Sequence, residues 1–226
     1  MNINYSVLLF GVIIIGLTSC KNNDEVFAPV INTGLTVVNA SADTLNFYLN
    51  GTRQNNTSSL FPGGSVINST VPAGLQNYQF KKAGGFNVLF SIPLTLTDST
   101  YNSLYVAGES ASLSFNTRDN IPMPSNNATS DTAYIRFVNA APDIGSLNVY
   151  IGSIVSFKAL AFKSSSAFLP LTGGQNEVKI FQAGAATPKI DTVITFEPNS
   201  VYTLFAKGLL NGKGNSVFDV GIVVNY

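Results

Sequence analysis

The sequence predicts an all-β protein built from two tandem sandwich domains. Val, Ile, Thr, Tyr and Phe recur in short runs, and Gly, Pro, Asn and Ser break these runs. Strands spaced at about 8–12 residues with such breaks are typical of antiparallel sandwiches. No long segment after residue 20 has the helical period. Short motifs also return at an offset near one hundred residues, and a period this long indicates tandem domains rather than a solenoid.

The first segment of the chain is expected to be a lipoprotein signal peptide. The apolar run Val7–Leu17 is too short to span a bilayer as a helix, which needs about 20 residues, but it suits the apolar region of a signal peptide. It leads into Leu17-Thr18-Ser19-Cys20, which resembles a bacterial lipobox. We therefore expect cleavage after residue 19 and acylation of Cys20 with palmitate-type chains. An uncleaved anchor or a buried strand is the alternative, and the absence of Lys and Arg from residues 1–6 departs from the usual signal.

Acylation would tether the mature protein to a membrane through residues 20–32. Lys21 follows the cysteine where an Asp would suggest retention at the inner membrane, so we expect an outer-membrane lipoprotein of the cell envelope. The run Lys21–Glu25 resembles the surface-export signal of Bacteroidetes lipoproteins, but it suits a solvated polar tether equally well. Surface exposure therefore stays open at this point.

Composition argues against most enzymatic and nucleic-acid functions. Lys plus Arg equals Asp plus Glu, so the chain has no basic excess with which to neutralise phosphates. It has no His and no Trp, and its single Cys is assigned to the lipid. The commonest general base, the commonest metal ligands and a thiol nucleophile are therefore missing. We expect no catalytic residues, no metal and no cofactor.

Eleven runs are expected to form strands, and two dipeptides are expected to form tight hairpin turns. Asn50-Gly51 and Asn211-Gly212 both combine residues that tolerate a positive φ. The expected strands are Leu35–Asn39, Leu45–Leu49, Tyr78–Lys82, Val88–Leu96, Leu104–Ala107, Tyr134–Asn139, Leu147–Ile151, Glu177–Gln182, Lys189–Phe196, Val201–Lys207 and Val217–Val224.

The internal repeat divides the chain. Val38-Asn39-Ala40 returns as Val138-Asn139-Ala140, and Asp43 returns as Asp143. Further matches continue in order to the paired glycines 108 and 208. Between the copies lies a segment rich in Pro, Asn, Ser and Thr. We therefore expect a first sandwich over residues 33–115, an extended linker over 116–131 and a second sandwich over 132–226.

The opening of the second copy resembles a known family. Arg136-Phe137-Val138-Asn139-Ala140-Ala141-Pro142-Asp143, followed by Leu147-Asn148-Val149-Tyr150, is similar to the start of the domain of unknown function 4397. The resemblance implies β-sandwich modules of bacterial lipoproteins and cell-surface proteins, with no assigned enzymatic activity. It makes the expected fold two tandem immunoglobulin-like or transthyretin-like β-sandwich domains after the signal peptide. The first copy departs from the motif at Thr36 and Ala42.

Turn chemistry offers a structural explanation for this motif. Pro142 presets φ, and Asp143 can cap its own backbone after the strand. Asn39 and Asn139 are expected to bond neighbouring backbone at the strand ends. Arg136 would pair with Asp143 or extend across the sheet edge, and Asp43 and Tyr150 complete the family positions. We favour this structural role over a ligand site.

Half of the eight Asp residues precede Ser or Thr in a pattern that resembles the O-glycosylation sequon of Bacteroidetes envelope proteins. An equally good explanation is that Asp-Thr marks the starts of strands. The expected acceptors under the first explanation are Thr44, Ser99, Thr132 and Thr192.

Three functions follow from these observations. The first is a non-enzymatic envelope lipoprotein whose sandwiches bind or display a partner such as a glycan or an envelope protein, with the lipid anchor as its membrane contact. The second is a structural subunit assembled by strand addition, for which Val217–Val224 would supply an edge strand. The third, a glycan-active enzyme with paired carboxylates, is disfavoured because only four Glu exist in the chain.

Overall fold

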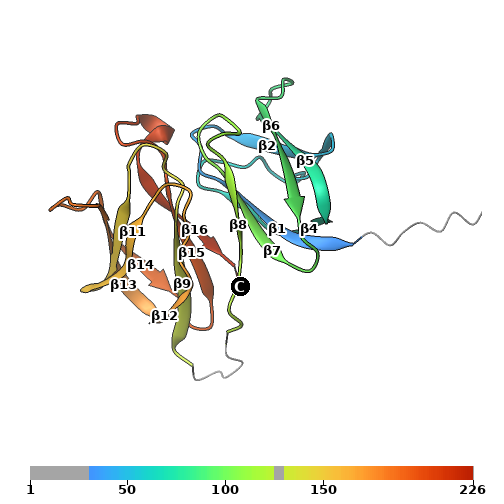
Figure 1. The fold of residues 1–226 in the computed structure, drawn as a ribbon. Helices are drawn as coiled ribbons and strands as arrows, with labels where there is room; N and C mark the ends of the chain where they lie inside the picture. Colours follow the sequence, from blue (N-terminus) through green and yellow to red (C-terminus); the bar gives the residue numbers. More distant parts are fainter. Residues whose placement is uncertain (1–30, 125–129, 226) are drawn as a thin grey trace, which may run out of the picture.

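The computed structural model describes residues 31–124 and 130–225, and these form two β-sandwiches side by side (Figure 1). The expected signal peptide, Cys20 and nearly all of the tether lie outside the described residues. Within the described ranges, no helix has the length and apolar character needed to cross a bilayer.

The first repeat contributes two four-stranded sheets, ordered β4-β1-β7-β8 and β3-β2-β5-β6. β1 and β7 run parallel, with Gly34 opposite Tyr101 and Asn39 opposite Val106, whereas the other pairs are antiparallel. The strands are β1 (Asn32–Asn39), β2 (Leu45–Leu49), β3 (Thr52–Arg53), β4 (Ser65–Pro72), β5 (Gly74–Lys82), β6 (Phe90–Leu96), β7 (Tyr101–Val106) and β8 (Phe115–Arg118).

The second repeat has the same topology, strand for strand. Its sheets are ordered β12-β9-β15-β16 and β11-β10-β13-β14, and β9 and β15 form the parallel pair. Its elements are β9 (Thr132–Asn139), β10 (Leu147–Ile151), β11 (Ile154–Leu160), β12 (Leu169–Thr172), β13 (Gly174–Gln182), β14 (Ile190–Phe196), β15 (Val201–Lys207), the short 3-10 helix η1 (Gly214–Ser216) and β16 (Asp219–Val224). The predicted all-β tandem fold is thereby confirmed.

Each sandwich has its own core between its two sheets. Alternate side chains of a strand point to opposite faces, so β5 places Tyr78 and Phe80 in the core of the first repeat. There the Phe80 ring stacks between Phe47 and Phe90, with ring centroids 6.3 and 5.2 Å away. The second repeat uses Phe137 and Phe157 in the same way.

The structure corrects the expected linker. Strand β8 occupies Phe115–Arg118 and pairs with β7, so three residues assigned to the linker belong to the first sandwich. The sequence of β8 is polar because it is a short edge strand with one face away from the core, and the apolar pattern therefore misses it. The strands β3, β4, β11 and β12 also escaped prediction. Edge position alone is not the reason, because the edge strands β6, β14 and β16 were predicted.

Of the two expected hairpin turns, one is right. Asn50 and Gly51 have φ of 48° and 88° and join β2 to β3 as a two-residue turn. Asn211 and Gly212 are not among the positive-φ residues, and a long loop containing η1 joins β15 to β16 instead. This prediction was wrong because β15 ends at Lys207 and β16 begins at Asp219, and these residues are too far apart in sequence for a tight turn.

Candidate functional site

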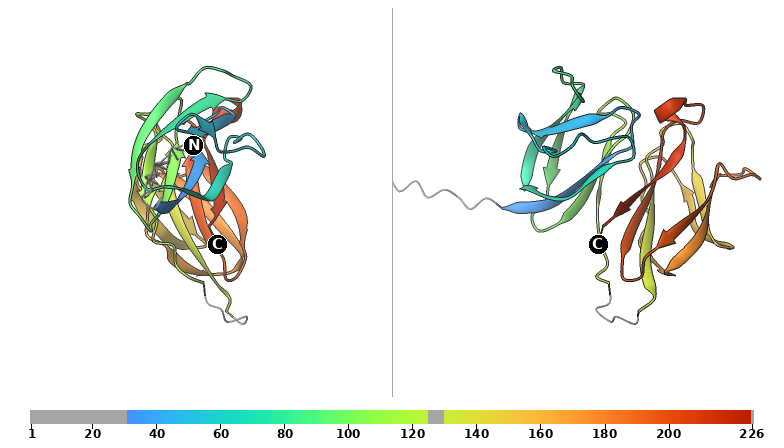
Figure 2. Two further views of the ribbon diagram at one scale, coloured as in Figure 1. Left: turned by 90° about the vertical axis from the view of Figure 1, so that its right-hand side faces the viewer. Right: turned by 180° about the vertical axis from the view of Figure 1, so that it is seen from behind.

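The two repeats meet through the sheets that contain their parallel strand pairs, β4-β1-β7-β8 and β12-β9-β15-β16. Figure 2 shows the two sandwiches side by side in two further views. Val38 and Tyr105 of the first repeat pack with Val138 and Phe205 of the second in one buried cluster. The rings of Tyr105 and Phe205 lie 6.1 Å apart between centroids. The protein is therefore four sheets deep, with a third apolar layer between its two domain cores.

A buried ion pair lies beside this apolar layer. Arg136 leaves β9 toward the first repeat, and its Nη1 donates to Asp119 Oδ1 over 2.7 Å. The two side chains are 3% and 2% exposed, so the pair is shielded from water. Asp119 also accepts hydrogen bonds from the hydroxyls of Ser103 and Thr117. Its carboxylate oxygens accept three hydrogen bonds, two from the first repeat and one from the second, so Asp119 is the polar centre of the interface.

The guanidinium of Arg136 has further partners in its own repeat. Its Nε donates to Thr203 Oγ1 over 2.9 Å, and Thr203 in turn donates to Asn225 Oδ1 over 2.6 Å. It also lies over the ring of Phe168, 4.8 Å from the centroid. Burial raises the pKa of the neighbouring Tyr105 to about 12, so its hydroxyl stays neutral.

This arrangement corrects the expected partner of Arg136. Asp143 does not bind it; its Oδ1 instead accepts from the backbone N–H of Leu210 over 2.9 Å. The reason is direction: the Arg136 side chain projects from the middle of β9 toward the other repeat, whereas Asp143 follows the end of that strand. The actual partner, Asp119, lies in the segment assigned to the linker, and no motif indicated it.

The motif asparagines bond nearby backbone. Asn139 Nδ2 donates to the carbonyls of Gly145 and Leu160 over 2.9 and 3.0 Å, and its Oδ1 accepts from the N–H of Ala141. Asn39 does the same in the first repeat with the carbonyls of Asp43 and Leu60. Both side chains are fully buried, so their amides fix the strand ends and have no surface to offer a ligand.

The turns that follow these asparagines form a cleft between the repeats. Ala40 and Ala42 line it from one side, and Pro142 and Leu209 line it from the other, around a volume of about 460 Å³. Its walls are mainly apolar. Glu109 stands at the rim, where Lys82 approaches it at 3.8 Å.

Lys82 links that rim to the family motif. Its Nζ lies 2.8 Å from Asp43 Oδ2, and a hydrogen bond to Asp43 raises the pKa of Lys82. Both partners are partly exposed, so this pair contributes little to stability. The cleft therefore joins the two copies of the motif.

The other predicted positions lie apart from this cleft. Tyr150 is on β10 in the outer sheet, where its ring contacts Phe181 edge to face at 5.1 Å. Among the expected glycan acceptors, Ser99 is exposed in the β6–β7 turn. The others are half-buried: Thr44, Thr132 and Thr192. Across the described ranges, no three His, Cys, Asp or Glu side chains gather as a metal site.

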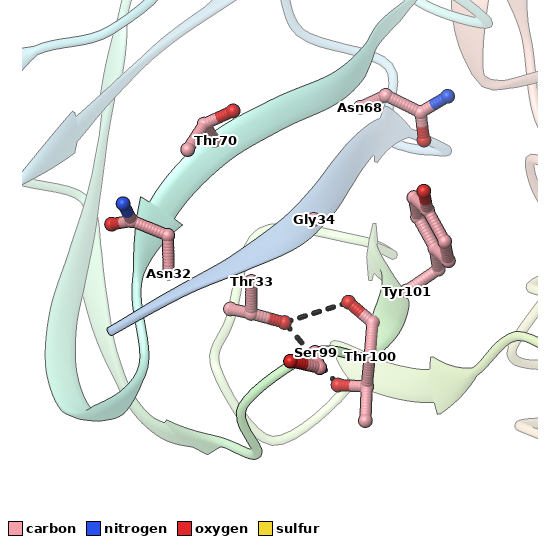
Figure 3. Close-up of a pocket in the computed structure, with 8 residues that line it drawn as sticks. All are labelled: Asn32, Thr33, Gly34, Asn68, Thr70, Ser99, Thr100 and Tyr101. Carbon is pink, nitrogen blue, oxygen red and sulfur yellow. Dashed lines mark hydrogen bonds between the residues drawn. The ribbon is translucent and has the colours of Figure 1, made fainter.

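A second opening, which sequence reasoning missed, lies on the first repeat alone. It has a volume of about 490 Å³ and is lined by residues of β1, β4 and the start of β7, among them Tyr101 (Figure 3). One sequence signal could have found it. In the first copy the paired positions on the parallel strands hold Gly34 and Tyr101, whereas in the second copy they hold Tyr134 and Val201, so the aromatic residue lies on the opposite strand.

Comparison with known proteins identifies the repeats. The family model of the domain of unknown function DUF4397 matches residues 33–150 and again residues 133–219, and the two matches overlap at the start of the second repeat. Curated proteins gave no match to the chain. Among solved structures, the Bacillus anthracis TIE protein matches 78% of this chain and 34% of its own, with 10% identity and a TM-score of 0.23. The chain thus spans about a third of that structure.

Proposed function

We propose, from the premise that this chain belongs to the DUF4397 family, that it is a non-enzymatic, lipid-anchored protein of the bacterial cell envelope. In this proposal, acylated Cys20 holds it at the outer membrane, and the paired sandwiches bind or display a partner such as a glycan or an envelope protein. The lipobox-like segment supports the membrane anchor, and the two openings on the sandwiches support binding.

The observation that carries the proposal is that the two repeats pack against each other through a buried interface. The interface buries an apolar cluster and an ion pair that is 3% and 2% exposed, and such contacts hold two domains in a fixed relation. The polar residues of the family motif are used in this scaffold rather than aimed at a reacting group. A fixed scaffold with two recessed surfaces suits recognition.

The proposed lipid anchor is tested by labelling growing cells with a clickable palmitate analogue. The wild-type chain should take up the label, and Cys20→Ala, which removes the only cysteine, should not. Digestion of intact cells with protease, read through a tag after Tyr226, then separates surface from periplasmic display. An unlabelled wild-type chain found in the soluble fraction would contradict the proposal.

Assembly by strand addition is the alternative. Each sheet draws all four of its strands from one repeat, so neither sandwich needs a donated strand. We therefore expect the detergent-solubilised chain to remain monomeric as its concentration rises. Concentration-dependent polymers in analytical ultracentrifugation would support the structural subunit instead.

A further inference from the structure

We infer that the groove on the first repeat binds a neutral carbohydrate, with Tyr101 as the platform on which a sugar ring stacks. This inference rests on the proposed binding function and names its site and ligand class. The groove measures about 490 Å³, which falls in the range of small-molecule sites. In Figure 3 its side chains come from β1, β4 and the turn before β7.

Tyr101 is the aromatic side chain of the groove. It is 53% exposed, and it stands opposite Gly34 in the parallel register of β1 and β7. A Cβ added to Gly34 would approach Tyr101 Cδ1 to 2.7 Å and Cε1 to 3.1 Å, so this edge of the ring lies against the β1 backbone. A ring held along one edge loses little freedom when a ligand covers an exposed part of it. The C–H face of a sugar can bury apolar area on such a surface.

The side chains around the ring are uncharged and can both donate and accept hydrogen bonds. Asn32, Asn68, Thr70 and Ser99 supply two amides and two hydroxyls, and none of the described residues lining the groove is ionisable except the phenol itself. Asn68 also bonds Thr36, and Ser99 donates to the neighbouring Asp98, so Asn32 and Thr70 are the more available partners. The hydroxyls of a neutral sugar match this set. An anion would find no cation here, and an apolar ligand would strip water from the amides without replacing its hydrogen bonds.

The floor and the rim of the groove are held in place. Thr33 Oγ1 donates to the carbonyl of Thr100 over 2.7 Å, and Asn102 Nδ2 donates to Thr100 Oγ1 over 2.8 Å. At the rim, Asn68 and Ser99 have φ of 49° and 53°, in the left-handed region that non-glycine residues seldom occupy. Asn199, which matches Ser99 in the second repeat, has a φ of 59°, so at Ser99 this backbone belongs to the turn between β6 and β7.

The second repeat provides an internal comparison. Tyr134 occupies the Gly34 position and Val201, fully buried, occupies the Tyr101 position. Phe168 replaces Asn68 there, and it is covered by the Arg136 guanidinium. At these positions the second repeat therefore has a tyrosine, a buried valine and a phenylalanine in place of the glycine, the Tyr101 ring and the Asn68 amide.

The test is affinity electrophoresis of the full chain in detergent. Native gels would contain soluble starch, laminarin or galactomannan as neutral polysaccharides, and polygalacturonate as the anionic one. We expect at least one neutral polysaccharide to slow the wild-type protein. Tyr101→Ala should weaken that interaction by roughly tenfold or more because the stacking face is gone. Gly34→Ala should also weaken it, since its Cβ displaces the ring.

Phe86→Ala is the matched control. Phe86 is 92% exposed at the tip of the β5–β6 turn, at the opposite end of β6 from the groove, so its loss should leave retardation unchanged. Thermal unfolding would establish that each variant is folded. The inference is overturned if none of the three neutral polysaccharides retards the protein, if polygalacturonate alone does, or if retardation survives Tyr101→Ala. Lipid labelling and protease accessibility are measured separately, so a failure of carbohydrate binding would not contradict the proposed membrane anchor.

Discussion

Replacing Asp119 by Ala should break the interface between the repeats. The substitution removes the carboxylate that binds Arg136 Nη1 at 2.7 Å and that also accepts from Ser103 and Thr117. Arg136 is 2% exposed, so its charge would be left buried without its partner. Water cannot reach the site to compensate unless the two sheets separate.

The expected loss follows from that geometry. Removing one member of a buried ion pair costs about 3–5 kcal/mol, chiefly because the other charge remains in a medium that solvates it poorly. With a urea m-value of about 2 kcal/mol/M, the unfolding midpoint should fall by about 1.5–2.5 M, or the first of two separated transitions should appear. Replacing both partners, as Asp119→Leu with Arg136→Met, should recover most of the loss because no charge is left behind.

The assay is urea unfolding followed by far-ultraviolet circular dichroism and tyrosine fluorescence. Lys179→Ala is the control, because Lys179 forms an ion pair with Glu177 at 2.7 Å on the exposed outer sheet and its loss should not move the transition. A drop below about 1 kcal/mol for Asp119→Ala would refute the reasoning. So would a double variant no more stable than the single one, since the penalty would then not be the orphaned charge.

Three further predictions follow from buried contacts. Burial raises the pKa of Tyr78 to about 12 from 10.0, so the contribution of this group to stability should be constant below pH 10 and should fall by about 3 kcal/mol as the pH rises toward 12. In alkaline urea titrations, Tyr78→Phe should remove that part of the decline. Asn139→Ala should destabilise the protein by about 3 kcal/mol in thermal unfolding, because it leaves two buried carbonyls and one N–H without hydrogen-bond partners. An unchanged stability would show that water replaces the amide. Gly221→Ala would place a Cβ 2.2 Å from Phe205 Cζ, and the overpacking should lower the free energy of unfolding by about 1–3 kcal/mol. An unchanged melting temperature would mean that the side chains at the interface rearrange at little cost.

The sequence determined the fold class and the tandem arrangement because both depend on local patterns. Short β-branched and aromatic runs with turn residues specify strands, as in Leu45–Leu49 and Val201–Lys207, whose bounds the structure reproduces. The repeat of Val38–Ala40 at 138–140 specified two copies of one topology. Strand β8 escaped because Phe115 is its only apolar residue, and β12 escaped because Pro170 interrupts a run of four residues.

Only the tertiary structure decided how the repeats combine and where they are open. Arg136 opens the family motif but Asp119 lies outside it, and they meet because β9 and the end of β8 face each other across the interface. Gly34 and Tyr101 meet because β1 and β7 pair in parallel across a long sequence gap. A sequence records which residues follow one another and with what period, whereas contacts between strands depend on register and packing, which no local pattern encodes.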